Sequence, residues 1–276
     1  MNKPFCFFVN FADYNQSFRI MNKLFFTLIL MLVSFTASAQ TSPRGDLNND
    51  GIVSISDVME LVDIILHGDV PQVYTQCPDD HHPHLIDLGL PSGTLWACCN
   101  VGADKPEDYG DYFAWGEVTP KSEYNWGTYK WCNGSNSTLT KYCTHSDYGN
   151  DGFVDNKTVL EAEDDAAHAS WGGGWRMPTK AEFEELLANT TCEWTTQNGV
   201  NGRKFTSTNK GSIFLPAGYR WNGELNGTGS RGDYWSSTLY ESYPDYARYL
   251  FFDSGYVYPD GFDRFYGQSV RPVRQN

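Results

Sequence analysis

Hydrophobic residues follow three different patterns along the chain. Residues 24–35 form one apolar run in which only two positions are polar. Between residues 58 and 66, apolar residues recur at helical spacing, which predicts one short amphipathic helix. Beyond residue 84, short apolar and aromatic runs are separated by Gly, Asn and Asp, and runs of this size predict strands. These runs are 93–97, 112–115, 212–216, 234–237 and 249–252.

Two helices are predicted in the long C-terminal region. One covers residues 160–170. The other begins after Pro178, where Thr179 and Glu182 have the spacing of a capping box. Few helices among many short strands and long loops indicate an α+β fold. The buried face of the second helix is predicted to consist of Phe183, Leu186 and Leu187.

The first apolar run has the features of a secretory signal peptide. Lys23 precedes it, and Ala37 and Ala39 form an Ala-x-Ala cleavage site after it. A transmembrane helix needs about 20 apolar residues, so this run is too short for one. The alternative is a buried core helix. We expect cleavage after Ala39, export of the chain, and a location outside the cell, at its surface or in the periplasm.

Composition limits the classes of partner. The chain has 276 residues, 40% of them hydrophobic and 16% aromatic, which is enough apolar material for a packed core. The formal net charge is -14. Nucleic acids and anionic membranes are polyanions, so this charge argues against both as partners. Cations, neutral glycans and other proteins remain compatible with it.

Export changes the interpretation of the cysteines. Six cysteines follow the signal peptide, and six thiols allow 15 disulfide pairings. Cys132 with Cys143 closes a short polar loop, and Cys99 with Cys192 is a second candidate pair. Free buried thiols are the alternative. The six are Cys77, Cys98, Cys99, Cys132, Cys143 and Cys192.

No zinc site is expected from cysteine spacing. Cys98 and Cys99 are adjacent, and the other spacings match no zinc module. Three histidines lie in a short segment that also contains proline, and we expect them to be solvated. These histidines are His81, His82 and His84.

Residues 46–57 have the pattern of a calcium loop. Oxygen-bearing side chains stand at loop positions 1, 3, 5, 9 and 12, and Gly51 at position 6 allows the sharp turn. A solvated acidic turn is the alternative. The closing aspartate, followed at once by an apolar-periodic helix, resembles a dockerin repeat, present here as one copy over 46–69. The predicted Ca²⁺ ligands are Asp46, Asn48, Asp50, the carbonyl of Ile52, Ser54 and Asp57.

Six motifs in order resemble the Fibrobacter succinogenes major paralogous (FISUMP) domain. They are DLGLPSGTLWA at 87–97, FAWGE at 113–117, WRMPT at 175–179, FLPAGYR at 214–220, GDYWSS at 232–237 and SVRPVR at 269–274. The resemblance implies export and a fold similar to the C-type-lectin-like fold of formylglycine-generating enzymes. It implies no established activity.

The predicted organisation has five parts. An N-terminal extension plus signal peptide covers 1–39, and a linker covers 40–45. The dockerin-like calcium loop and helix cover 46–69, and a second linker covers 70–83. The C-type-lectin-like domain covers 84–276, with short twisted strands, two helices and long loops.

The C-terminal domain carries no recognisable catalytic pattern. Formylglycine-generating enzymes hold copper with a late cysteine pair, and no cysteine follows Cys192. His145 and His168, the two histidines of the matched region, are expected to be ordinary surface or core residues. Acidic pairs are too common in this chain to identify a glycosidase. We therefore expect no enzyme activity.

Aromatic residues suggest binding instead. Three turn-like segments are candidates for stacking against sugars, whereas Trp96, Trp175 and Trp235 are expected in the core. We expect an exported, non-catalytic, calcium-binding protein that binds glycans or mediates adhesion. The alternatives are a dockerin-type component of a polysaccharide-degrading assembly and an unrecognised glycan hydrolase. The three segments are 221–223, 233–235 and 256–258.

Overall fold

The computed structural model describes residues 53–55, 58, 73–78, 82–221 and 224–275. The chain divides into two compact units, Met1–Pro43 and Arg44–Asn276, and every described residue belongs to the second. The predicted signal peptide therefore lies outside the described residues, as do all predicted calcium ligands except Ser54, which is partly buried. In the described part of the chain, no helix has the length and apolar character needed to cross a membrane.

A four-stranded sheet forms one side of the domain, in the order β1-β2-β3-β14. Its first two strands are parallel and the other pairs are antiparallel. The first strand lies in the segment predicted as a linker, so the described residues 73–78 are tied into this sheet. The strands are β1 (Val73–Tyr74), β2 (Leu85–Ile86), β3 (Leu95–Ala97) and β14 (Val273–Arg274).

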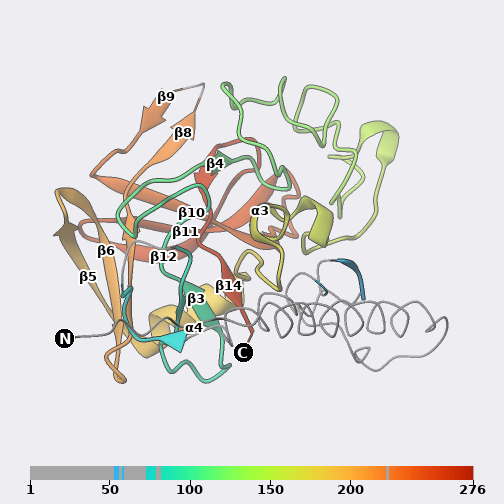
Figure 1. Ribbon diagram of the computed structural model, residues 1–276. Helices are drawn as coiled ribbons and strands as arrows, with labels where there is room; N and C mark the ends of the chain where they lie inside the picture. The colour runs from blue at the N-terminus through green and yellow to red at the C-terminus, as the bar shows by residue number, and fades with distance from the viewer. Residues whose placement is uncertain (1–52, 56–57, 59–72, 79–81, 222–223, 276) are drawn as a thin grey trace, which may run out of the picture. The chain divides into compact units, whose positions relative to one another are not determined.

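A five-stranded sheet lies at the centre of the domain, in the order β12-β11-β10-β13-β4 (Figure 1). Its three long strands are antiparallel neighbours. They are β10 (Arg231–Leu239), β11 (Tyr246–Asp253) and β12 (Val257–Asp263), and the short strands are β4 (Tyr112–Phe113) and β13 (Gln268–Ser269).

Two smaller sheets complete the β-structure. The three-stranded sheet contains β5 (Thr190–Gln197), β6 (Val200–Ser207) and β7 (Ser212–Pro216). The two-stranded sheet contains β8 (Tyr219–Trp221) and β9 (Glu224–Asn226). The runs predicted as strands all correspond to strands of the structure. The hairpin of β5 and β6 was not predicted.

The helix predicted after Pro178 is confirmed as α4 (Lys180–Asn189). Its capping box is complete, because the Thr179 side chain accepts from the Glu182 backbone and the Glu182 side chain accepts from the Thr179 backbone. Phe183 and Leu186 are fully buried.

The helix predicted over 160–170 is shorter than expected. It consists of a 3₁₀ turn, η2 (Ala162–Asp164), and α3 (Ala166–Trp171). The Asp165 side chain accepts from the backbone of Ala167 and His168, so the helix begins only after this residue. Gly172, at φ 59, ends it. A further 3₁₀ turn, η1 (Asn150–Gly152), lies in the long loop before it.

Each face of the five-stranded sheet contributes to a hydrophobic cluster. One face packs with α4 and the two neighbouring sheets around Trp96, Phe183 and Phe252. The other packs with α3 and the long loop region around Trp115 and Trp235. The core positions predicted for Trp96, Trp175 and Trp235 are confirmed, since all three are buried. The predicted α+β class is also confirmed, and strands predominate over helices in the described residues.

Candidate functional site

Aromatic side chains surround one arginine on the five-stranded sheet. Arg231 begins β10, and its guanidinium carbon lies 4.8 Å from the ring centre of Tyr219, 5.1 Å from Phe251 and 5.2 Å from Phe262. We call the following set the arginine face: Tyr219, Arg231, Phe251, Tyr258, Phe262 and Tyr266.

Strand register brings these residues together. Asp233 of β10 lies opposite Phe251 of β11, which lies opposite Tyr258 of β12. Residues directly opposite each other share one face of the sheet, and Arg231 shares that face with Asp233 because it is two positions earlier. Tyr258 packs on Phe251 with ring centres 5.0 Å apart. These three opposing residues therefore run across the sheet from the buried carboxylate of Asp233 to the exposed ring of Tyr258.

Arg231 is oriented by a buried carboxylate. Its Nε donates to Oδ1 of Asp233 at 3.0 Å, and Asp233 is completely buried. Burial raises the pKa of Asp233 to about 6, opposed by the charge and hydrogen bond of Arg231. Among the described residues, neither terminal nitrogen of Arg231 has a hydrogen-bond acceptor, and 29% of the side chain is exposed. These nitrogens are thus available to a ligand.

The arginine face offers both apolar and polar contacts. Tyr258 is 44% exposed, and Tyr219, Phe251, Phe262 and Tyr266 are partly exposed. Two residues beyond Tyr258 on the same strand, the exposed Asp260 adds a hydrogen-bond acceptor. Flat rings, a fork of N–H donors and a carboxylate are the groups that a polyhydroxylated ligand can use.

The three predicted aromatic segments have different outcomes. Tyr256 and Tyr258 are exposed, as a binding role requires. Asp233, Tyr234 and Trp235 are buried, so this segment cannot contact a ligand through its aromatic rings. In the third segment, residues 222–223 lie outside the described residues.

Cysteines and histidines also cluster beside the four-stranded sheet, where β2 begins and β3 ends. One ligand atom from each of Cys77, His82, His84 and Cys98 lies within 4.8 Å of all the others, a grouping able to hold a metal ion. His84 is buried. The expectation of solvated histidines is therefore wrong for His84, because the start of β2 turns this side chain into the domain. His81 lies outside the described residues.

Hydrogen bonds favour a thiolate at Cys98. The pKa of its thiol is lowered by the neighbouring Cys99 side chain, the backbone N–H of His84 and the rings of His82 and His84, against the opposing effect of burial. The pKa of the Cys99 thiol is raised by its hydrogen bond with Cys98 and by burial. The pKa values of the two adjacent thiols are therefore shifted in opposite directions.

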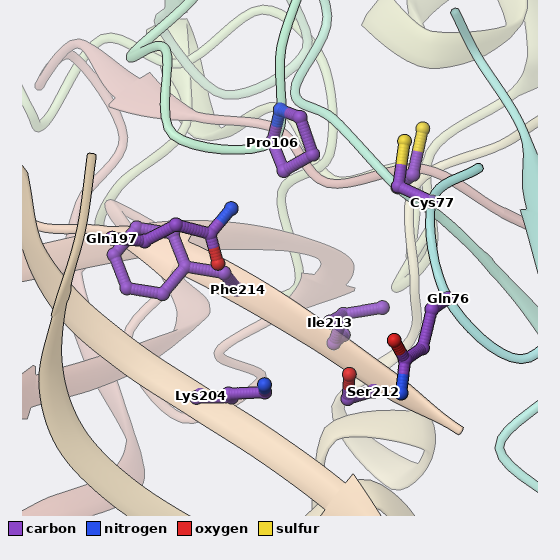
Figure 2. A pocket seen from close by; sticks show the side chains of 9 residues that line it. Gln76, Cys77, Pro106, Gln197, Lys204, Ser212, Ile213 and Phe214 are labelled. Carbon is purple, nitrogen blue, oxygen red and sulfur yellow. The ribbon is translucent and has the colours of Figure 1, made fainter. Parts of the chain in front are cut away.

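A cavity of about 150 Å³ lies beside this cluster (Figure 2). Cys77 and Cys98 form part of its lining, together with polar side chains from β5, β6 and β7. In Figure 2, Cys77 lies on the opposite side of the cavity from Gln197 and Phe214. The cluster is thus close to an opening of the domain.

The disulfides predicted from spacing are not formed in this structure. All six described cysteines are free thiols. The Cys132 thiol donates to the carbonyl of Trp126 at 3.2 Å, and the Cys143 thiol donates to that of His145 at 3.1 Å. Both thiols thus use other partners.

The two histidines of the matched region differ in their surroundings. His145 is 57% exposed and lies 3.7 Å from an exposed aspartate, and His168 lies on the partly exposed side of α3. The described structure leaves the calcium prediction untested, because of its ligands only Ser54 is described.

Comparison of the chain with protein-family models, with curated proteins and with solved structures finds no match in any of the three.

Proposed function

We propose that this chain is an exported, non-catalytic protein that binds a neutral saccharide at the arginine face of a C-type-lectin-like domain. The observation that carries the proposal is the partly exposed aromatic surface around Arg231, with free guanidinium N–H groups at its centre. The signal-like segment supports export, and the dockerin-like segment is proposed to bind Ca²⁺.

The charge of the site favours a neutral ligand. Asp233 neutralises Arg231, so the pair carries no net charge when both are ionised. The whole chain has a net charge of -14, which repels polyanions at long range. The face therefore offers Arg231 as a donor to sugar hydroxyls, and its rings as surfaces for the apolar C–H faces of a sugar.

Retardation of the full chain in gels containing neutral polysaccharides tests the proposal. We expect retardation by at least one of xylan, mixed-linkage β-glucan, galactomannan or starch. Arg231→Gln should weaken it because the amide lacks the forked donors. Tyr258→Ala should weaken it by about tenfold, the size of one lost ring contact.

Tyr243→Ala is the matched control. Tyr243 is 54% exposed, but its ring packs with Tyr240 and Tyr246 at the opposite end of β11 from Asp253. This variant should bind like the wild type. Equal binding by all three variants, or no binding to any neutral polysaccharide, contradicts the proposal.

A glycan hydrolase is the second candidate, favoured by one pair of carboxylates. Burial and the nearby Asp245 raise the pKa of Asp263 to about 6, and burial raises the pKa of Asp245. A carboxyl group whose pKa is raised toward neutrality is suited to general acid catalysis. Release of reducing sugar by the wild type but not by Asp263→Asn would favour this function over simple binding.

A further inference from the structure

We propose that Cys77, His82, His84 and Cys98 form a tetrahedral binding site for one Zn²⁺ ion. Four sulfur–nitrogen separations define the cluster. Cys77 Sγ lies 3.4 Å from Nδ1 of His82 and 3.3 Å from Nδ1 of His84. Cys98 Sγ lies 2.9 Å and 3.5 Å from the same two atoms.

These separations fit the edges of a zinc tetrahedron. Zinc binds thiolate sulfur at about 2.3 Å and imidazole nitrogen at about 2.0–2.1 Å, which places sulfur and nitrogen ligands about 3.5 Å apart. Three of the four measured separations lie within about 0.2 Å of this value, and the fourth, between Cys98 Sγ and His82 Nδ1, is shorter at 2.9 Å. The four ligand atoms therefore surround a space of the size that the ion occupies.

Sheet pairing, rather than sequence spacing, builds the site. Leu85 lies opposite Ala97 in the antiparallel pair of β2 and β3, so His84 and Cys98 are the next opposing residues. Cys98 N donates to the His84 carbonyl at 3.1 Å, which fixes this pair. His82 is two residues before His84, on the same side.

Cys77 reaches the cluster through β1. Val73 and Tyr74 pair in parallel with Leu85 and Ile86, and the chain then continues to Cys77. Thr75 also accepts through its carbonyl from Ser212 N at 2.8 Å. Two contacts with the domain thus hold the segment that supplies the fourth ligand.

The ligand chemistry selects a soft or borderline metal. The cluster contains two sulfurs and two imidazoles and no carboxylate. Ca²⁺ requires six to eight oxygen ligands, so this site does not suit it. Two thiolates balance the charge of a divalent ion, which makes the bound group neutral and suitable for burial.

Groups around the ligands hold them in place. The backbone N–H of His84 donates to Cys98 Sγ at 3.1 Å. The fully buried Arg271 donates to the Cys98 carbonyl at 2.9 Å. The Tyr74 ring packs edge-on against the His84 ring, with centres 5.2 Å apart. Such outer contacts orient metal ligands and support their affinity.

Four protein ligands indicate a structural metal. They complete the tetrahedron and leave no position for substrate or water. Bound Zn²⁺ would fasten residues 73–78 and 82–84 to the sheet, and the neighbouring cavity gives the ion a route to the site. The proposal is independent of the proposed saccharide site, which lies on a different sheet.

Metal content and spectroscopy of the full chain test the site. The chain is produced with Zn²⁺ and purified in the presence of a non-thiol reductant. We expect one zinc per chain by elemental mass spectrometry. Replacement by Co²⁺ should give the intense visible bands of tetrahedral cobalt and thiolate-to-cobalt charge transfer in the near ultraviolet.

Variants identify the ligands. Cys98→Ser and His84→Ala should each lower zinc affinity by more than about 100-fold, since each removes a direct ligand. Cys132→Ser and His145→Ala are the matched controls and should retain one zinc, because both residues lie outside the cluster.

Thiol alkylation of the wild type tests the site without relying on variants that could misfold. Alkylation of Cys77 and Cys98 should be slow with zinc bound and fast after chelation, whereas alkylation of Cys132 should not change. Three results would overturn the proposal: no zinc in the purified chain, octahedral cobalt spectra, or alkylation of Cys77 and Cys98 that chelation does not change.

Discussion

At the residue scale, the arginine face depends on a carboxylate that the solvent does not reach. Asp233 is completely buried, and its Oδ2 has no hydrogen-bond partner among the described residues. Its other oxygen accepts from Arg231 at 3.0 Å. Removing one partner of such a pair leaves an unpaired buried group, which is more costly than the pair is stabilising. We infer that Asp233 serves to position Arg231.

Asp233 should give the protein a measurable pH dependence. Its pKa is raised to about 6 in the folded state, from an ordinary value of 3.8, so the native state binds more protons between these values. Stability should therefore fall as pH rises through this window and become constant above it. The expected fall is on the order of 3 kcal/mol.

The Asp233→Asn variant isolates this contribution. Asp263, whose pKa is also raised to about 6, remains in both proteins and cancels in the comparison. Urea unfolding at about pH 4 and pH 7 should show that the difference in free energy of unfolding between wild type and variant depends on pH. A difference that stays constant would contradict the assigned role of burial.

Residue identity alone could not reveal either cluster. Arg231 and Tyr258 are 27 positions apart, and they share one face only because β10 and β12 both pair with β11 in a fixed register. Likewise, His84 and Cys98 become neighbours through the pairing of β2 and β3. Cysteine spacing gave no sign of the proposed zinc site, because known zinc modules describe local loops rather than ligands joined across a sheet.

At the element scale, local signals predicted α4 well and the β5–β6 hairpin poorly. The helix has an apolar face and a capping box, both of which are readable from adjacent residues. The hairpin is rich in threonine and polar residues, so it lacks an apolar run. Its turn contains Asn198 at φ 47 and Gly199 at φ 85, and an Asn-Gly pair is a strong hairpin signal. The Asn198-Gly199 pair was therefore a signal from which the β5–β6 hairpin could have been predicted.

The cap of α4 should be important for stability. Thr179 Oγ1 accepts from Glu182 N, so Thr179→Ala should lower the free energy of unfolding by about 1 kcal/mol. Glu182 also accepts from Arg176 at 2.8 and 2.6 Å, so Glu182→Ala should cost more, about 2–3 kcal/mol.

Urea denaturation of the full chain checks both variants against Glu184→Ala. Glu184 pairs with Lys180 on the exposed side of the same helix, and such a pair contributes less than about 1 kcal/mol. A Thr179→Ala variant as stable as the wild type, or an equal loss from all three, would show that the cap does not stabilise this helix.

At the scale of the whole molecule, the predicted calcium segment precedes a domain with its own core. Among the described residues, the two large hydrophobic clusters are formed by residues from position 74 onward. Three carboxylates in the loop repel one another without an ion. We therefore expect Ca²⁺ to order the loop while the domain remains folded in its absence.

Calorimetric titration of the full chain with Ca²⁺ measures binding by the predicted loop. The wild type should bind one Ca²⁺, and Asp50→Ala should abolish the binding heat because it removes a hard oxygen ligand. Asp63→Ala, which changes an acidic residue outside the loop, should leave it intact. Identical heats for wild type and Asp50→Ala would make residues 46–57 an ordinary acidic turn.

The most direct test of the proposed function is calorimetry with one neutral oligosaccharide, chosen as the shortest fragment of a polysaccharide that retards the full chain. We predict a single binding site on the wild type, an affinity about tenfold lower for Tyr258→Ala, and an unchanged affinity for Tyr243→Ala. Unchanged binding by Tyr258→Ala, or tighter binding of an acidic oligosaccharide of equal length, would contradict a neutral-saccharide site at the arginine face.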